Sequence, residues 1–202
     1  SQRWRSRVRS LLIIMTLSLL CLEGLIRTAT LPTDLQSRTR EETQRVYDRY
    51  GQLLRALPNS EGLKQIEISY EQVSPHFVHA LLCLEDRGFW THSGVPIRGV
   101  VRALWANLKA GRRVAGGSGL TQQVIKLHQG RARGMRSKLR EAIQAYALER
   151  RLSKEEILTL YLNRAPFGSR YQGLEAAALG YFRVSAWMLS PGQAAYLATL
   201  PY

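Results

Sequence analysis

The stretch that decides the fold is LLCLEDRGFWTHSG, residues 81–94. Its first half is an apolar run with helical character, and the run delivers two adjacent carboxylates, Glu85 and Asp86, at its end. A carboxylate placed where an apolar helix stops is partly withdrawn from water, which suits it to proton transfer. A solvated helix end accounts for the same pair equally well, so a catalytic role requires that the rest of the chain supply a substrate.

The composition is strongly basic. The chain has 202 residues, with 29 Lys and Arg against 15 Asp and Glu, which gives a formal net charge of +14. Such a charge indicates a polyanionic partner: nucleic acid, an anionic membrane surface or phosphate groups. The two cysteines, Cys21 and Cys83, lie in different segments and are not expected to form a disulfide, and no Cys/His spacing resembles a zinc site.

Residues 1–26 predict a basic cytoplasmic tail and a membrane anchor. Arginines alternate over residues 3–9, and the apolar span Leu11–Ile26 follows, whose 16 residues make a helix of roughly 24 Å. This is short of the ~30 Å hydrocarbon core, and flanking Arg side chains can snorkel to make up part of the difference. A cleaved signal peptide is the competing interpretation, but no small-x-small cleavage site follows. The arginines predict a cytoplasmic N-terminus with the rest of the chain outside, which argues against a nucleic-acid partner.

The rest of the chain divides at about residue 74. Residues 27–73 predict a juxtamembrane linker and a small β element, with two short strands around a turn that ends at Gly51 and a third strand over residues 65–70. Residues 74–202 predict one almost entirely α-helical domain. Caps, breakers and apolar spacing predict helices over residues 74–84, 97–110, 120–129, 135–152, 153–163, 173–181 and 190–200.

Two further features of this domain are candidates for binding an anion. The Gly-rich loop at residues 116–119 leads straight into a helix, where backbone N–H groups can cradle an anion, although a plain flexible connection explains it more simply. A basic series surrounds it: Lys126, Arg131, Arg133, Arg136, Lys138 and Arg140. The helix over 135–152 is expected to bury the stripe Met135, Leu139, Ala142, Ile143 and Tyr146. Glu141 then falls about 200° from Leu139, either on a solvated face or on a cationic groove wall.

Five motifs in a fixed order resemble one family. They are EDRGFWTHSG (residues 85–94), GGSGLTQQVIK (116–126), KLRE (138–141), YLNRAPFG (161–168) and GLEAAA (173–178). This order resembles the peptidoglycan glycosyltransferase domain, glycosyltransferase family 51, of class A penicillin-binding proteins and their monofunctional relatives. The run over 161–168 most resembles the penicillin-binding protein 1C branch.

The resemblance implies a fold and an activity. The fold would be a mainly α, lysozyme-like glycosyltransferase domain on the outer, periplasmic face of the bacterial cytoplasmic membrane, held by a single-pass anchor. The activity would be polymerisation of lipid II into β-1,4-linked glycan strands, with release of undecaprenyl pyrophosphate. The implied partners are lipid II, the growing glycan, membrane lipids and other cell-wall synthesis proteins, together with a divalent cation such as magnesium or manganese.

The resemblance also assigns roles residue by residue. Glu85 would be the general base, and Glu141 would assist in the donor site. The residues expected to hold the pyrophosphates are Lys126, Arg133 and Lys138. Those expected to contact the substrate or shape the cleft are Ser118, Gln122 and His92. Structural roles are expected for Tyr161, Asn163 and Glu175.

The chemistry of the residues points the same way. A sugar transfer through an oxocarbenium-like state needs a positioned carboxylate, and a pyrophosphate leaving group needs cations where charge develops. A polyprenyl substrate needs an enzyme held at the membrane, which the anchor supplies. The excess of basic residues is then explained by phosphates and anionic headgroups.

Four positions depart from the family pattern: Pro96, Gly119, Leu127 and Ser137. They put the donor-site geometry in question rather than the proposed base. Two other functions stay open: a lysozyme-like lytic enzyme that cuts glycan with Glu85, and a non-catalytic membrane scaffold that binds lipid II. The chain has no Ser-x-x-Lys or Lys-Thr-Gly motif and begins without Met, as expected for a piece of a longer bifunctional protein.

Overall fold

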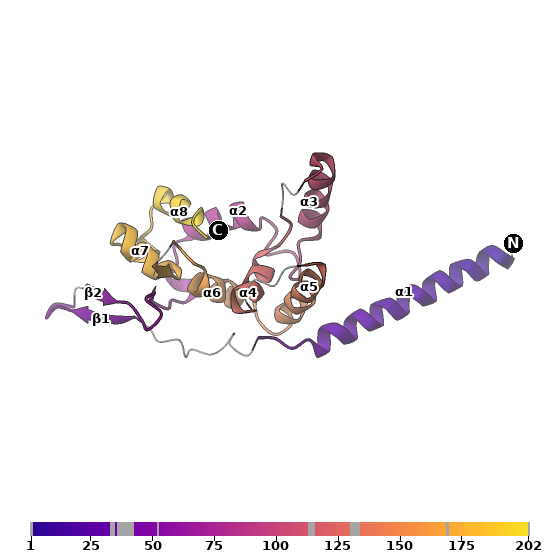
Figure 1. Cartoon of the computed structure of the whole chain (residues 1–202), viewed down its shortest axis with the longest axis horizontal. Helices are drawn as coiled ribbons and strands as arrows, with labels where there is room; N and C mark the ends of the chain where they lie inside the picture. The colour runs from indigo at the N-terminus through magenta and orange to yellow at the C-terminus, as the bar shows by residue number, and fades with distance from the viewer. Residues whose placement is uncertain are drawn as a thin grey trace.

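The protein is mainly helical, with a long helix at one end and a β-hairpin at the other (Figure 1). A computed structural model describes residues 2–32, 35, 43–51, 53–112, 116–129, 134–168 and 170–201. Between the two ends lies a body of packed helices that contains the core. The predicted fold class, a mainly α domain with a small β element and one N-terminal apolar helix, is confirmed.

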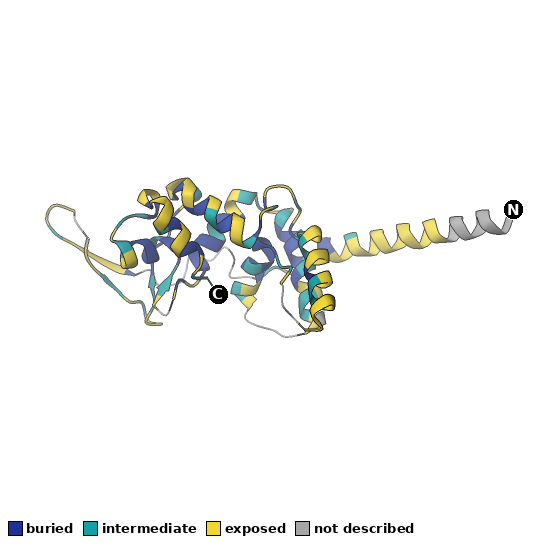
Figure 2. Cartoon of the chain, turned by 90° about the horizontal axis from the view of Figure 1, so that it is seen from above, coloured by how far each residue is buried: buried dark blue, intermediate teal, exposed yellow. Residues whose placement is uncertain are grey.

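The N-terminal helix α1 is the element suited to a membrane. It runs over Gln2–Thr28 without a break, so it is longer than its apolar part. The window Leu11–Thr28 is long and apolar enough to cross a membrane, and almost all of it is exposed. Figure 2 shows the contrast between this exposed helix and the buried interior of the helical body.

The end of α1 is fastened to the helix α5 (Met135–Glu149) and the residue after it. The guanidinium of Arg150 donates two hydrogen bonds to the carboxylate of Glu23, at 2.6 and 2.7 Å. The hydrogen bond with Glu23 raises the pKa of Arg150. The Gln144 side chain donates to the carbonyl of Thr30 at 2.8 Å, and Ile26 is buried. The end of α1 is therefore positioned by the same helix that carries Lys138 and Glu141.

The β element is a hairpin and a separate two-residue pairing. Strands β1 (Gln44–Tyr47) and β2 (Leu53–Leu57) are antiparallel, and β3 (Lys64–Gln65) pairs in parallel with β4 (Tyr171–Gln172). The third strand predicted over residues 65–70 is wrong beyond its first residue. At Ile68 the amide and carbonyl bond to the side chain of Asn163, at 3.0 and 2.8 Å, instead of to a neighbouring strand.

The predicted helices are present within a few residues of their expected ends. Beyond α1 and α5 they are α2 (Pro75–Glu85), α3 (Ile97–Ala110), α4 (Leu120–Gln129), α6 (Lys154–Arg164), α7 (Leu174–Phe182) and α8 (Pro191–Ala198). Two short 3-10 helices, η2 (Tyr70–Gln72) and η3 (Ala186–Met188), were not predicted. Ser153 and Glu156 form the predicted capping box at the start of α6.

The core fixes the helix that ends at Glu85. Helix α2 packs against α8, and α4 packs against both α5 and α6. The largest fully buried side chains include Phe77 and Leu81 of α2, Leu120 of α4 and Tyr161 of α6. Since α2 and α4 share this core, the C-terminal end of α2 is held against the N-terminal half of α4.

The predicted apolar stripe of α5 is wrong. Leu139 is 62% exposed, and Ala142, Ile143 and Tyr146 are only half-buried. The buried face carries instead Glu141, Gln144, Ala145 and Leu148. This face is buried because α4 and the end of α1 pack on the same helix. Glu141, which the pattern placed opposite the core, is only 6% exposed.

Candidate functional site

Glu85 is the last residue of α2, and its two carboxylate oxygens have different surroundings. Oε2 accepts a hydrogen bond of 2.7 Å from the side-chain amide of Gln123 on α4. Oε1 is withdrawn from solvent, and no donor among the described residues bonds to it. Buried polar atoms in proteins nearly always have a partner, so the acceptor capacity of Oε1 is left unused by the described part of the fold.

Asp86, the next residue, is fully engaged. It is 5% exposed, and its carboxylate accepts from His92 Nε2 at 2.8 and 2.9 Å and from the Leu120 amide at 3.0 Å. The Leu120 amide is one of the N–H groups at the start of α4 that have no partner within the helix. Asp86 therefore joins the loop after α2 to the start of α4 and is not free to react.

The two departures at Gly119 and Pro96 belong to this junction. A Cβ on residue 119 would lie 2.5 Å from Asp86 Oδ2 and 2.8 Å from Cδ of Pro96. Such distances are far inside ordinary contact, so any larger side chain would displace one of these neighbours. The two departures are in contact with each other, and the pair preserves the bonds of Asp86.

A second polar cluster lies where α5 faces the loop before α4. Lys138 Nζ donates to Glu141 Oε2 at 2.6 Å and to Ser118 Oγ at 3.1 Å. The Ser137 hydroxyl is 3.5 Å from Glu141 Oε1. Ser118 lies two residues before α4, and α4 bonds to the end of α2 through the Leu120 amide and the Gln123 side chain, so this cluster and Glu85 both lie at the start of α4. The structure therefore brings both predicted acidic residues to one region.

The other predicted site residues are placed as follows. Lys126 is exposed on α4, one turn beyond Gln123, and forms no ion pair with a described residue. Gln122 is buried, and its Oε1 accepts from the Gly119 amide at 3.2 Å, which fits the cleft-shaping role among the two predicted for it. His92 has the same kind of role through Asp86. Arg133 lies outside the described residues.

The other two departures from the family pattern, Leu127 and Ser137, leave Glu141 with a cationic partner. Arg136 is exposed, whereas Lys138 supplies the positive charge that Glu141 contacts. Leu127 is half-buried and packs against the core. Asn163 bonds to Ile68, and Glu175 accepts from the Ala186 amide at 2.7 Å, which agrees with the structural roles predicted for both residues.

Sequence reasoning missed two groups around the site. Gln123 holds Glu85, yet it is 38 residues away in the chain, and only its place in the motif signals importance. Glu149 Oε1 accepts from Thr121 Oγ1 at 2.6 Å and from Lys154 Nζ at 2.7 Å. Lys154 also donates to the His92 carbonyl, at 2.6 Å. Glu149 and Lys154 therefore connect α4 to the loop after Asp86. The sequence around these residues does not predict this network.

The described side chains contain no cluster of metal ligands. Among the residues that the structure describes, no three His, Cys, Asp or Glu side chains lie close enough together to hold an ion. Glu141 offers one carboxylate, and Lys138 already occupies one of its oxygens.

The sequence that forms this site can be compared with the sequences of known proteins. The family model described as transglycosylase matches residues 50–202. The chain belongs to the transglycosylase family. Penicillin-binding protein 1C of Escherichia coli K12 is 46% identical over 143 residues, which is 71% of this chain and 19% of the relative.

Two other relatives of this family extend the comparison. Penicillin-binding protein 1A of Aquifex aeolicus is 40% identical over 172 residues, which is 84% of this chain and 23% of the relative. A biosynthetic peptidoglycan transglycosylase of Alcanivorax borkumensis is 46% identical over 132 residues, which is 65% of this chain and 54% of the relative. The chain thus spans about a fifth of the two penicillin-binding proteins and about half of the third relative.

Proposed function

We propose that this transglycosylase polymerises lipid II into β-1,4-linked glycan strands with Glu85 as general base. The observation that carries the proposal is the asymmetry of the Glu85 carboxylate. One oxygen is held by Gln123, and the other is buried and has no donor among the described residues. In such a carboxylate only the oxygen without a donor is available to accept a proton from a bound hydroxyl.

The transfer then proceeds in one displacement. Glu85 Oε1 accepts the proton of the 4-hydroxyl of the acceptor sugar as that oxygen attacks C1 of the donor sugar. The bond from C1 to the pyrophosphate oxygen breaks, and undecaprenyl pyrophosphate leaves with the bonding electron pair. Attack opposite the leaving group inverts C1 and gives the β link, as expected of an inverting hexosyltransferase.

The basic residues stabilise the departing pyrophosphate. Lys138 is held by Glu141 and Ser118, so its ammonium is fixed before charge develops on the leaving group. Lys126 projects from α4 with its charge unpaired among the described residues, and Arg133 is proposed to join it. Glu141 acts in the donor site by positioning Lys138.

Magnesium or manganese enters this proposal only with the substrate. Magnesium is commonly held by one or two carboxylates together with substrate phosphates. A bound ion would neutralise charge on the pyrophosphate, and Glu141 would be the residue proposed to help hold it. The proton transfer to Glu85 does not depend on the ion.

The proposed location is the bacterial cytoplasmic membrane, with the catalytic domain on the periplasmic side. Helix α1 would be the single-pass anchor, and the basic residues before its apolar part favour a cytoplasmic N-terminus. Helix α3 adds an exposed apolar face: Ile97, Val101, Leu104, Trp105 and Leu108. Arg98, Arg102 and Lys109 on the same helix suit anionic headgroups, so membrane lipids are proposed partners, as are other cell-wall synthesis proteins.

The proposal is tested by giving the full chain in lipid vesicles two substrates in separate reactions. Lipid II should yield glycan polymer, and finished peptidoglycan should remain intact. Release of soluble fragments from finished peptidoglycan without polymer from lipid II would favour the lytic enzyme. Binding of lipid II without any polymer would favour the scaffold. The presence of a chelator in a third reaction reports whether a divalent cation contributes.

A further inference from the structure

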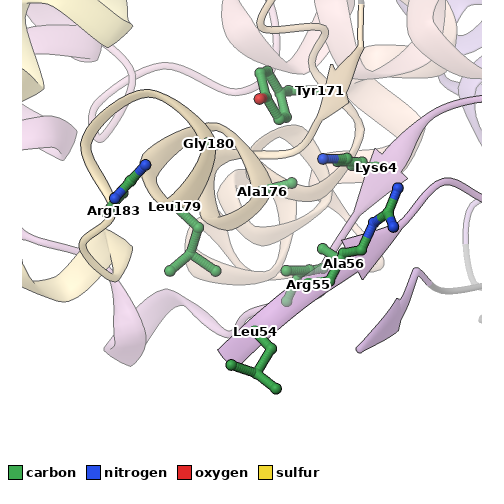
Figure 3. A pocket seen from close by; sticks show the side chains of 10 residues that line it. Leu54, Arg55, Ala56, Lys64, Tyr171, Ala176, Leu179, Gly180 and Arg183 are labelled. Carbon is green, nitrogen blue, oxygen red and sulfur yellow. The ribbon is translucent and has the colours of Figure 1, made fainter. Parts of the chain in front are cut away.

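A separate region of the structure, between the hairpin and α7, contains no residue of the Glu85 site. It is a cavity of about 670 Å³, lined by β2, β3, β4 and α7 (Figure 3). Its lining residues are Leu54, Arg55, Ala56, Lys64, Ile66, Tyr171, Ala176, Leu179, Gly180 and Arg183. None of these residues contributes to the transglycosylase site, so the cavity needs an explanation of its own.

The cavity faces the open edge of a β-strand. Three consecutive residues of β2 line it, Leu54 to Ala56. Successive side chains of a strand point to opposite faces, so a cavity that touches three in a row lies along the edge of the strand. The other edge of β2 is paired with β1, and β1 is the only described strand bonded to it. An open edge offers unpaired amide and carbonyl groups to an added strand.

The cavity is also lined by positive charge only. Arg55 comes from β2, Lys64 from β3 and Arg183 from the end of α7, and no acidic residue is among the lining residues. Figure 3 shows these three side chains around the cavity. Arg183 has φ +58°, the only positive φ among the described residues other than glycine. Arg183 is the C-cap of α7, and helices commonly end on a residue in this left-handed conformation, which fixes where its side chain leaves the helix.

The floor between the charges is apolar and closely packed. Ile66 and Ala176 are 5% and 3% exposed. Tyr171 packs so closely on α7 that a Cβ at Gly180 would overlap its ring. The cavity therefore combines a hydrogen-bonding edge, three cations and an apolar floor.

We propose that this cavity binds an acidic, extended peptide segment of a partner protein, added as a strand to the open edge of β2. Strand addition supplies main-chain hydrogen bonds, and pockets for alternate side chains supply specificity. Acidic side chains would pair with Arg55, Lys64 and Arg183, and apolar side chains would lie on the floor. The inference does not depend on the glycan chemistry proposed for Glu85.

Other occupants fit the surface less well. A second copy of this chain would bring the same three cations to the edge, and like charges would repel. A lipid headgroup would leave the strand edge unpaired, and the hairpin lies at the end of the long axis opposite the anchor helix α1 (Figure 1). A free phosphate would use the cations but neither the edge nor the apolar floor.

The test measures binding of labelled pentapeptides to the full chain in detergent, by fluorescence anisotropy. The first peptide alternates Glu and Val, the second replaces Glu with Lys, and the third carries a methyl group on every backbone nitrogen. Inorganic phosphate is added as a competitor. The Glu/Val peptide should bind at least tenfold more tightly than the other two, and millimolar phosphate should leave most of it bound.

Two variants localise the binding. K64M combined with R183G removes two cations, and glycine keeps the positive φ at residue 183 without strain. This variant should weaken the Glu/Val peptide at least tenfold, whereas R45A, an exposed cation of β1 that is not among the lining residues, should change its affinity less than twofold. Polymerisation of lipid II should be unchanged in both variants.

Three results would overturn the proposal. Equal binding of the methylated peptide would exclude strand addition, and full competition by phosphate would reduce the cavity to an anion site. Unchanged affinity in the K64M/R183G variant would place the peptide elsewhere on this basic protein. The peptide comparisons use the unmodified chain, so they hold even if the double variant does not fold.

Discussion

Glu85 and Asp86 are adjacent in the chain, yet the structure surrounds them in opposite ways. Asp86 accepts three hydrogen bonds from two groups, so both of its oxygens are used. Glu85 has one oxygen held by Gln123 and one oxygen with no described protein donor. In the sequence the two carboxylates are adjacent and chemically alike. Only their neighbours in α4 and in the loop after α2 distinguish the proposed base from the structural residue.

The largest effect short of removing the acid should come from shortening it. E85D keeps the charge but withdraws the carboxylate by one methylene, and a misplacement of about 1 Å can lower a rate by about a hundredfold. We expect polymerisation of lipid II to fall by about that factor with an unchanged melting temperature. E155D, an exposed position on α6, is the matched control and should keep full activity.

Removing the donor that holds Glu85 should have a smaller effect. Q123L deletes the hydrogen bond to Oε2, and a hydrogen bond to a charged group contributes about 1.5–3 kcal/mol. Polymerisation should fall at least tenfold, while Q129L at the exposed end of α4 should have no effect. Equal rates in Q123L and the unmodified protein would show that the carboxylate does not need this amide.

Asp86 should respond in stability more than in catalysis. D86N keeps the size of the side chain but cannot serve both donors, and a buried donor left without a partner costs about 1–3 kcal/mol. Chemical unfolding in detergent should show this loss, while the rate per folded molecule changes less than in E85D. A D86N variant of full stability and abolished activity would reverse the roles assigned to the two carboxylates.

The smallest expected effect concerns Gly119, which lies against Asp86. G119A places a methyl group against Asp86 Oδ2 and Pro96, and overpacking of this kind costs about 1 kcal/mol or somewhat more. G116A is the matched control, because a Cβ there meets no atom within 4 Å. Differential scanning fluorimetry of the two variants should separate them, and identical melting temperatures would mean that Asp86 adapts without cost.

Local signals in the sequence were sufficient for most of the helices. Ser153 with Glu156 marked the start of α6, and the apolar run before Glu85 marked α2, because capping and periodicity act over a few residues. The same reasoning failed on α5, where Glu141 and Gln144 are buried and Leu139 is exposed. Hydrophobic periodicity assumes that apolar residues face the core, and a helix that buries polar side chains breaks that assumption.

Contacts between distant residues account for what the sequence could not provide. The parallel pair β3 and β4 joins Gln65 to Gln172, and the pattern at either end contains no sign of the other. The motif order predicted that Glu85, Ser118, Lys138 and Glu141 belong to one site. It did not indicate that Gln123 would hold Glu85 or that Gly119 would make room for Asp86.

The most direct test of the central claim replaces the Glu85 carboxylate by an amide. E85Q preserves the size of the side chain but cannot accept a proton, and general base catalysis contributes about 10²–10⁴-fold. Polymerisation of lipid II should fall by that factor, while the melting temperature and the binding of lipid II remain those of the unmodified protein. A folded E85Q variant that polymerises lipid II at the full rate would contradict the account.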